Sequence, residues 1–358
     1  MLFLPEDEDR GKHGRNEGML DKCRDAPVRL GPSGTEGDMA LEDAKHEVDG
    51  AFTRAELKGL SFENAFAGAP SFLRRRYTKD LAGVDLAITG IPFDQSVTNR
   101  PGTRLGPRAI REASLLQPFD PPYGWDGFSP LEDLAITDHG DMALDYAFTA
   151  DVPARIEAHV TGILAAGAGC IALGGDHSIT LPILRAHAAK HGPLALIQVD
   201  AHTDTWVDDD PARIDHGTFC YTAVKEGLID VARSAHVGIR TVVADNLGIP
   251  IHDAAEVHAR GAAAVALDLK ARAGDHPVYL SFDIDGLDPA YAPGTGTPVW
   301  GGLTSAQAAA LLRGLAGINL VGGDVVEVSP PFDHAAITAV AAAHVAMELI
   351  CLWGWRRR

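Results

Sequence analysis

The sequence predicts an α/β fold in which a parallel β-sheet lies between two layers of helices. Three observations lead to this prediction. From about residue 80 onward, short apolar runs alternate with amphipathic helical stretches. The apolar runs are hydrophobic on both faces, which is typical of strands buried in a parallel sheet. At least six such units follow one another in one run, and this favours a single three-layer domain over two domains.

The strand predictions rest on continuous apolar runs that are separated by enough chain for a helix. The first is VDLAITGIP, residues 84–92, whose length and composition indicate a fully buried strand. Similar runs recur as far as the C-terminal region. The predicted strands cover residues 84–92, 134–142, 169–176, 194–202, 235–240, 277–285 and 320–328.

Helices are predicted between these strands. Residues 107–114 begin with Pro107, and proline is favoured in the first turn of a helix, where its missing N–H is not needed. The stretch 151–168 has apolar residues on one helical face, at Ile156, Val160, Ile163 and Leu164. Further helices are predicted at residues 181–192 and from about Ala335 to Trp353.

The N-terminal region has a different character. Residues 1–60 are rich in charged residues and glycine, and they lack a sustained apolar period. We therefore predict a flexible arm, or an extension that wraps around a neighbouring subunit. Met19 and Met39 are alternative start sites within it. Residues 61–358 would then form the folded domain.

Composition excludes several classes of protein. The 358 residues include 31 Lys and Arg against 49 Asp and Glu, giving a net charge of -18. Such an acidic surface argues against binding to nucleic acid or a membrane surface, and it favours a small cationic partner. Four widely spaced cysteines without a CxxC pair exclude a disulfide framework and a cysteine zinc site. With no evident membrane span or signal peptide, we expect a cytoplasmic protein.

Acidic and histidine side chains follow three of the predicted strands. They come from the segments GGDHS, DAHTD and SFDIDG, each of which directly continues a buried run. Ligands bind at the carboxyl ends of parallel strands, and residues two apart in a strand share a side. We therefore expect these side chains to face a common space. The candidates are His177, Asp200, His202, Asp204, Asp283 and Asp285.

This set of residues favours a pair of divalent metal ions. Four crowded carboxylates would repel one another and take up protons unless cations balanced them. Oxygen and nitrogen donors without thiolate favour manganese first, and nickel or cobalt next, over structural zinc. Such a metal pair would acidify a shared water for attack. Alternatively, the Asp in DHS could cap a helix, and the DxD pair could be a solvated turn or a calcium loop.

Several long motifs carry a resemblance to a known family, and they occur in the family's order. They are residues 90–114, 174–182, 200–206, 215–230, 281–304 and 324–339. With these motifs the sequence resembles the ureohydrolases, the arginase/agmatinase family, and most closely the agmatinase branch. The resemblance covers nearly everything from residue 80 onward, whereas the first sixty or so residues have no clear counterpart.

The resemblance implies a three-layer α/β/α sandwich with a mostly parallel eight-stranded sheet, and residues 61–358 as its catalytic domain. It implies a homo-oligomer, a trimer or hexamer, and two divalent ions per subunit, usually manganese and in some members nickel. One ion would be held by His177, Asp200, Asp204 and Asp283. The other would be held by Asp200, His202, Asp283 and Asp285, so that Asp200 and Asp283 bridge the two.

The same resemblance assigns catalytic roles to three residues. Asp204 would also orient the attacking hydroxide. His216 in DHGT matches the family's proton-shuttling histidine, and Glu327 in DVVEVSP matches the acid that binds the guanidinium. Physical chemistry agrees with these roles, because a carboxylate can pair with a planar guanidinium and an imidazole can protonate a departing amine. Taken alone, His216 could be a loop histidine and Glu327 a member of a buried ion pair.

The implied reaction is hydrolysis of a guanidino C–N bond, which releases urea and an amine. We expect agmatine as the substrate, because the loop before His216 carries the acids Asp208, Asp209 and Asp210, which would attract a cationic tail. These acids could equally be solvated. Phe219 and Cys220 stand where a methionine and an aromatic residue usually follow HGT, which leaves the pocket shape open. Trp125 and Trp300 are candidates for the pocket entrance or for the core.

Other substrates and other functions stay open at this point. Guanidinobutyrate, guanidinopropionate, free guanidine and a biguanide such as metformin are alternative substrates, with nickel as the alternative metal. A non-catalytic subunit of a hetero-oligomer is a rival function, but such subunits typically lose metal ligands, and none is lost here. A deacetylase-like hydrolase with one metal would leave the second Asp pair unexplained.

Overall fold

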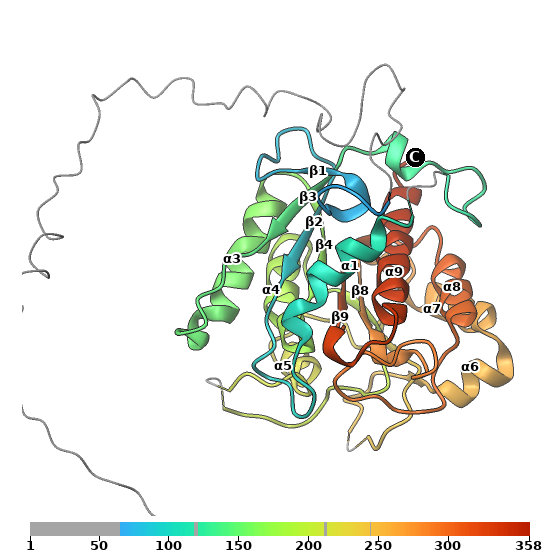
Figure 1. Ribbon diagram of the computed structural model, residues 1–358. Coiled ribbons are helices and arrows are strands. Elements are labelled where there is room, and N and C mark those ends of the chain that lie inside the picture. The colour runs from blue at the N-terminus through green and yellow to red at the C-terminus, as the bar shows by residue number, and fades with distance from the viewer. Residues whose placement is uncertain (1–64, 118–120, 211–212, 244) are drawn as a thin grey trace, which may run out of the picture. The chain divides into compact units, whose positions relative to one another are not determined.

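The computed structural model describes residues 65–358, apart from residues 118–120, 211–212 and 244. The predicted arm, residues 1–60, lies outside the described residues. The described part of the chain belongs to one compact unit. It contains an open β-sheet with helices against both faces (Figure 1).

Within the described residues the sheet has nine strands, all paired in parallel, in the order β1-β3-β2-β4-β9-β8-β5-β6-β7. The strands are β1 Arg76–Tyr77, β2 Leu86–Ile91, β3 Ile136–Asp141, β4 Gly169–Gly174, β5 Ala195–Val199, β6 Ala235–Val237, β7 Ile251–His252, β8 Val278–Asp283 and β9 Leu320–Val326. All seven strands predicted from the apolar runs are confirmed. The expected count of eight differs from this sheet, whose outermost strands, β1 and β7, have only two residues each.

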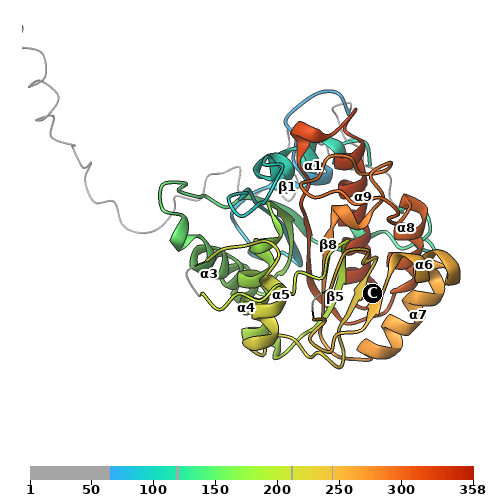
Figure 2. The same cartoon turned by 90° about the horizontal axis from the view of Figure 1, so that it is seen from below.

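Two helical layers cover the sheet, as the fold class predicts. The helices are α1 Gly106–Ser114, α2 Pro130–Asp133, α3 Val152–Ala165, α4 Thr180–His191, α5 Phe219–Lys225, α6 Ala254–Arg260, α7 Ala262–Ala273, α8 Ser305–Gly314 and α9 Ile337–Trp355. Figure 2 shows α3, α4 and α5 on one side of the sheet and α7, α8 and α9 on the other. Each layer closes its own hydrophobic core.

In strands β2, β4, β5, β8 and β9, alternate residues belong to the two cores. In β2, Leu86 and Ile88 pack toward α1 and α9, whereas Ala87 and Ile91 pack toward α3 and α4. This period of two is the geometric property of a strand, and both sets of side chains are fully buried. It explains why these strands read as continuous apolar runs rather than as alternating ones.

The C-terminal helix α9 confirms the helix predicted from about Ala335 to Trp353, but its apolar stretch is longer than the sequence analysis predicts. By length and composition alone, Ile337–Trp355 could cross a membrane, although no such run was expected from the sequence. In the structure 78% of its most apolar window is buried. It packs against α1, α8 and β9, so its hydrophobicity is that of a core helix.

The order of the central strands determines where the chemistry lies. Strands β4, β9, β8 and β5 are consecutive neighbours in the sheet. Because all four are parallel, the segments that follow them leave the sheet at the same edge. Chain segments more than a hundred residues apart in sequence are thereby brought side by side at that edge.

Candidate metal centre and active site

The turn after β4 presents His177. Gly175 has a φ of 33°, and a Cβ there would lie 2.5 Å from the backbone oxygen of Ile91, so the turn requires glycine. The Asp176 carboxylate then accepts a hydrogen bond from the Ser178 N–H and begins a short 3₁₀ helix, His177–Ile179. The capping role, which the sequence left open as an alternative, is therefore present at Asp176, and its neighbour His177 points into the site.

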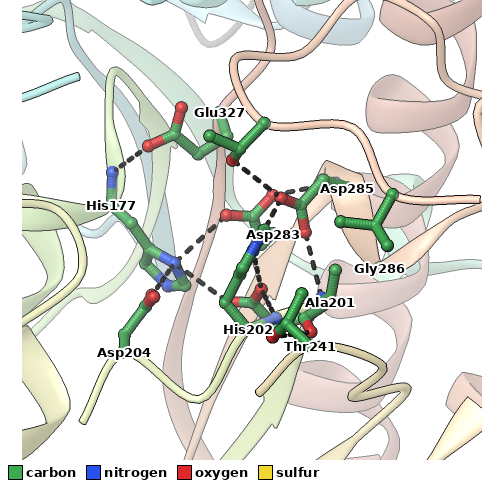
Figure 3. Close-up of polar contacts among 12 residues, drawn as sticks. His177, Ala201, His202, Asp204, Thr241, Asp283, Asp285, Gly286 and Glu327 are labelled. Atoms are coloured by element: carbon green, nitrogen blue, oxygen red, sulfur yellow. Dashed lines mark hydrogen bonds and ion pairs between the residues drawn. The ribbon is translucent and has the colours of Figure 1, made fainter. Parts of the chain in front are cut away.

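Three carboxylates surround one nitrogen of His177. Its Nδ1 lies 2.8 Å from Asp204 Oδ2 and 3.2 Å from both Asp200 Oδ2 and Asp283 Oδ2. Figure 3 shows these contacts converging on the imidazole ring. The Nδ1 atom is buried and has no hydrogen-bond partner among the described residues. Ligands about 2.1 Å from one ion lie roughly 3 Å from each other, so this spacing fits a shared cation.

A second group of donors lies beside the first. His202 Nδ1 lies 3.1 Å from Asp285 Oδ2 and 3.4 Å from Asp200 Oδ1. Asp200 thus directs one oxygen toward each histidine, as expected for a bridging ligand. Five of the six residues predicted to bind metal form two groups of potential ligands, and the sixth, Asp283, contacts His177 of the first group. The role of Asp283 as a second bridge stays a prediction.

The carboxylates disturb one another's ionisation. Burial, together with the charge of Asp200, raises the pKa of Asp204 to about 6. Burial and the neighbouring acids Asp285 and Asp200 raise the pKa of Asp283 well above its usual value. For Asp200, burial acts in the same direction, but the two histidines outweigh it and hold its pKa well below normal. The crowding predicted from the sequence is therefore present, and divalent cations would relieve it.

The ring of His177 is held from behind. Its Nε2 lies 2.8 Å from Ser281 Oγ, which itself donates to Asp324 Oδ1 at 2.6 Å. Ser281 must then accept from His177 Nε2–H, so Nδ1 keeps a lone pair for a metal. The Phe219 ring packs on the same imidazole, with centroids 4.4 Å apart. Phe219 and Cys220 are buried, so these two departures from the family pattern lie beneath the site.

Glu327 and His216 form a pair next to the metal ligands. Glu327 Oε1 accepts hydrogen bonds from the His177 backbone N–H at 2.9 Å and from His216 Nδ1 at 2.9 Å. Glu327 has a positive φ of 63°, an unusual backbone for a side chain of this size. Its second oxygen, Oε2, is buried and has no partner within the described part of the chain. The opposite nitrogen of His216, Nε2, lies 3.2 Å from Thr98 Oγ1.

The ion pair with Glu327 gives a prediction on pH. Burial opposes protonation of His216, but the Glu327 carboxylate outweighs it and raises the pKa of His216 to about 9. The raised pKa means that the pair stabilises the fold fully below the usual histidine pKa of about 6.5 and loses this contribution as the pH rises through 9. In the metal-free protein, Glu327→Gln should lower the pKa of His216, measured by NMR titration of its ring. An unchanged pKa would contradict the pairing.

A cavity of about 470 Å³ opens onto these groups. Its lining includes His177, His202 and His216 together with Asp204 and Asp283. The lining also includes Trp206 and Val207, which present exposed apolar surface. Of the two tryptophans considered for the entrance, Trp125 is a core residue and Trp300 is exposed outside the cavity lining.

Two residues that support the turn after β8, Arg240 and Thr297, are not predicted from the sequence. Arg240 donates to the backbone oxygens of Asp285, at 2.6 Å, and of Leu287, at 3.1 Å, and so holds the turn after β8. Thr297 Oγ1 donates to Asp285 Oδ2 at 3.2 Å. Arg240 ends the predicted strand 235–240, but arginine is common at such positions, so nothing in the sequence singles it out. Nothing in the sequence singles out Thr297 either, because hydroxyl residues are common in loops.

Comparisons with known proteins agree with this geometry. A sequence model of the arginase family matches residues 84–351. An agmatinase of Chromobacterium violaceum is 52% identical over 305 residues, which cover 85% of this chain and 94% of that protein. An agmatinase of Neisseria meningitidis is 47% identical over 274 residues, covering 76% and 88%.

Two solved structures share the fold. A hypothetical agmatinase from Burkholderia thailandensis has a TM-score of 0.83 at 53% identity and covers 87% of this chain and 98% of its own. Proclavaminate amidino hydrolase from Streptomyces clavuligerus has a TM-score of 0.77 at 36% identity, covering 82% and 100%. The strand order, the cluster of aspartates and histidines and these relatives lead to one conclusion: the chain belongs to the arginase family, as an agmatinase-like, metal-dependent ureohydrolase.

Proposed function

We propose that this ureohydrolase cleaves agmatine into putrescine and urea. The observation that carries the proposal is the buried Glu327 carboxylate, whose Oε2 has no partner in the described structure. An unpaired buried carboxylate oxygen is a strong acceptor for a cation with N–H donors. Agmatine ends in such a guanidinium, and relatives that are 47–52% identical carry the name agmatinase.

The residues present fit a pair of divalent ions, with manganese first and nickel second. His177, Asp200, Asp204 and Asp283 would hold one ion, and Asp200, His202, Asp283 and Asp285 the other. When bound, the ions supply an acidified water molecule and stabilise negative charge as it develops. The homo-oligomer, a trimer or hexamer, and the cytoplasmic location stay predictions.

The side chains of this chain would bind, orient and protonate the substrate. Glu327 would accept N–H bonds from the guanidinium and fix its central carbon near the carboxylate cluster. After water adds to that carbon, the bond to the tail nitrogen breaks, and this nitrogen needs a proton to leave as an amine. His216 can supply it, because its pairing with Glu327 keeps the ring protonated near neutral pH.

A urea-release screen tests the proposal. The purified protein is freed of metal, reloaded separately with manganese or nickel, and assayed with agmatine, guanidinobutyrate, guanidinopropionate, arginine, guanidine and metformin. We expect agmatine to have the highest kcat/KM, and the metal-free protein to release no urea. A higher kcat/KM for any other compound would replace agmatine as the substrate. No urea from any compound with either metal would contradict the proposed reaction.

A further inference from the structure

The acidic side chains in the loop between Trp206 and His216 differ in their exposure and in whether they line the cavity. Asp208 lines the cavity of the site, and its side chain is only 11% exposed. Asp209 is 67% exposed, lies outside that lining, and pairs with Lys225 and the Tyr221 hydroxyl. Of the three acids expected to attract the substrate, Asp208, Asp209 and Asp210, only Asp208 lines the cavity. A second acid of the lining, Asp215, lies next to His216 in the sequence.

A cation of the chain itself already lies between these two acids. Arg213 Nε lies 3.2 Å from Asp208 Oδ2, and Arg213 Nη2 lies 2.9 Å from Asp215 Oδ2. The two carboxylates are mostly buried, at 11% and 17% exposed, whereas the arginine side chain is 60% exposed. The pair of acids is thus part of the cavity wall, and Arg213, which bridges them, lines the same cavity.

The hydrogen bonds within this group are unequal. Asp208 Oδ2 is buried and makes no hydrogen bond of normal geometry to any residue that the structure describes, although the arginine is near. Asp208 Oδ1 accepts from the Asp210 backbone N–H at 3.0 Å. Oδ1 therefore stabilises the loop, whereas Oδ2 lies near the Arg213 guanidinium without accepting a hydrogen bond from it. Glu327 contacts the cavity residues His177 and His216 through Oε1, and its Oε2 is also buried and unpartnered among the described residues.

We infer that Asp208 and Asp215 bind the cationic tail of the substrate, and that Arg213 is an exchangeable counter-ion which the tail displaces. The inference rests on the proposed function, because it assigns the far end of the guanidine compound bound by Glu327. Because the Arg213 side chain is 60% exposed, its guanidinium stays hydrated when it moves into solvent, and the cation that replaces it keeps the two acids paired. An ammonium group that replaces it gains two partly buried carboxylates.

The test compares two variants and two substrates. Asp208→Asn keeps the Oδ1 acceptor and the size of the side chain, and Asp209→Asn is the matched control one residue away. Agmatine and butylguanidine have the same four-carbon tail, with and without a terminal ammonium. We expect Asp208→Asn to raise KM for agmatine about tenfold, from the loss of a charge-assisted hydrogen bond, with kcat within twofold.

The controls separate tail binding from a general defect. The KM for butylguanidine should stay within twofold in Asp208→Asn, and Asp209→Asn should leave both substrates unchanged. Equal effects on both substrates, or no effect on agmatine, would overturn the inference even though urea release still supports the proposed function. If neither compound is hydrolysed by the unmodified protein, the proposed function itself fails.

Arg213 gives an independent test, because its two possible roles predict different changes in KM. If it is a displaceable counter-ion, Arg213→Gln should lower KM for agmatine, because the tail then binds an unoccupied acid pair. If it instead binds the carboxylate of a tail such as that of guanidinobutyrate, the substitution should raise KM for guanidinobutyrate and leave agmatine unchanged. The second result would overturn the inference.

Discussion

Replacing Asp283 by asparagine is expected to abolish urea release. Asp283 is 3% exposed, and its Oδ2 lies 3.2 Å from His177 Nδ1. Its Oδ1 accepts the Asp285 backbone N–H at 2.8 Å, and asparagine can keep this bond. The substitution therefore removes the charge of an expected metal ligand while retaining the turn. Because losing even an outer partner of a ligand reduces metal affinity or activity 10–100-fold, we expect turnover to fall by at least about 100-fold.

Two measurements check this result. Steady-state turnover gives the activity, and elemental analysis gives the metal content, which should fall from about two ions per subunit in the unmodified protein. The matched control is Asp275→Asn, because the Asp275 side chain is 96% exposed and outside the cavity. Retention of more than a tenth of the unmodified turnover would count against a metal pair that depends on Asp283.

Glu327→Gln should have an effect of similar size with a different signature. Glutamine has the same shape, but it presents an N–H donor or a neutral oxygen where the guanidinium needs a carboxylate. Truncating one partner of a buried, hydrogen-bonded charge pair weakens binding by about 2–5 kcal/mol, so kcat/KM should fall by about 100-fold or more. Metal content should stay at the unmodified level, because Glu327 is not among the expected ligands.

The control for this substitution is a second buried glutamate. Glu348 is 7% exposed, lies in α9 and pairs with Arg313, outside the cavity of the site. Glu348→Gln should reduce thermal stability and leave kcat/KM for agmatine unchanged. If Glu327→Gln lost metal as well as activity, or if it kept its activity, the assignment of Glu327 to the guanidinium would be wrong.

The sequence was sufficient to predict the central sheet and the residues that meet at its edge. A strand buried on both faces is mostly apolar along its length, and β2, β4, β5, β8 and β9 each have five or more residues that are all buried. In a parallel sheet, whatever follows such strands must gather at one edge, so proximity could be inferred without coordinates. The two-residue edge strands, β1 and β7, are too short to leave any periodic signal.

Other features depend on contacts that no local pattern carries. The supporting roles of Arg240 and Ser281 arise from packing between distant segments, and neither residue type is unusual in its sequence context. The split between Asp208 and Asp209 is of the same kind. Both are acids in one loop, and only the direction of each side chain separates a cavity wall from a surface ion pair.

His177 takes part in two recognition events at once. Its ring faces the carboxylates that would hold the cations, and its backbone N–H donates to Glu327, which would hold the organic substrate. His177 therefore connects the two groups. Coordination that fixes its ring would also fix the position of Glu327, the expected acceptor for the guanidinium. Where bound cations favour guanidinium binding in this way, linkage requires that a bound guanidine compound raise the affinity for the cations by the same factor.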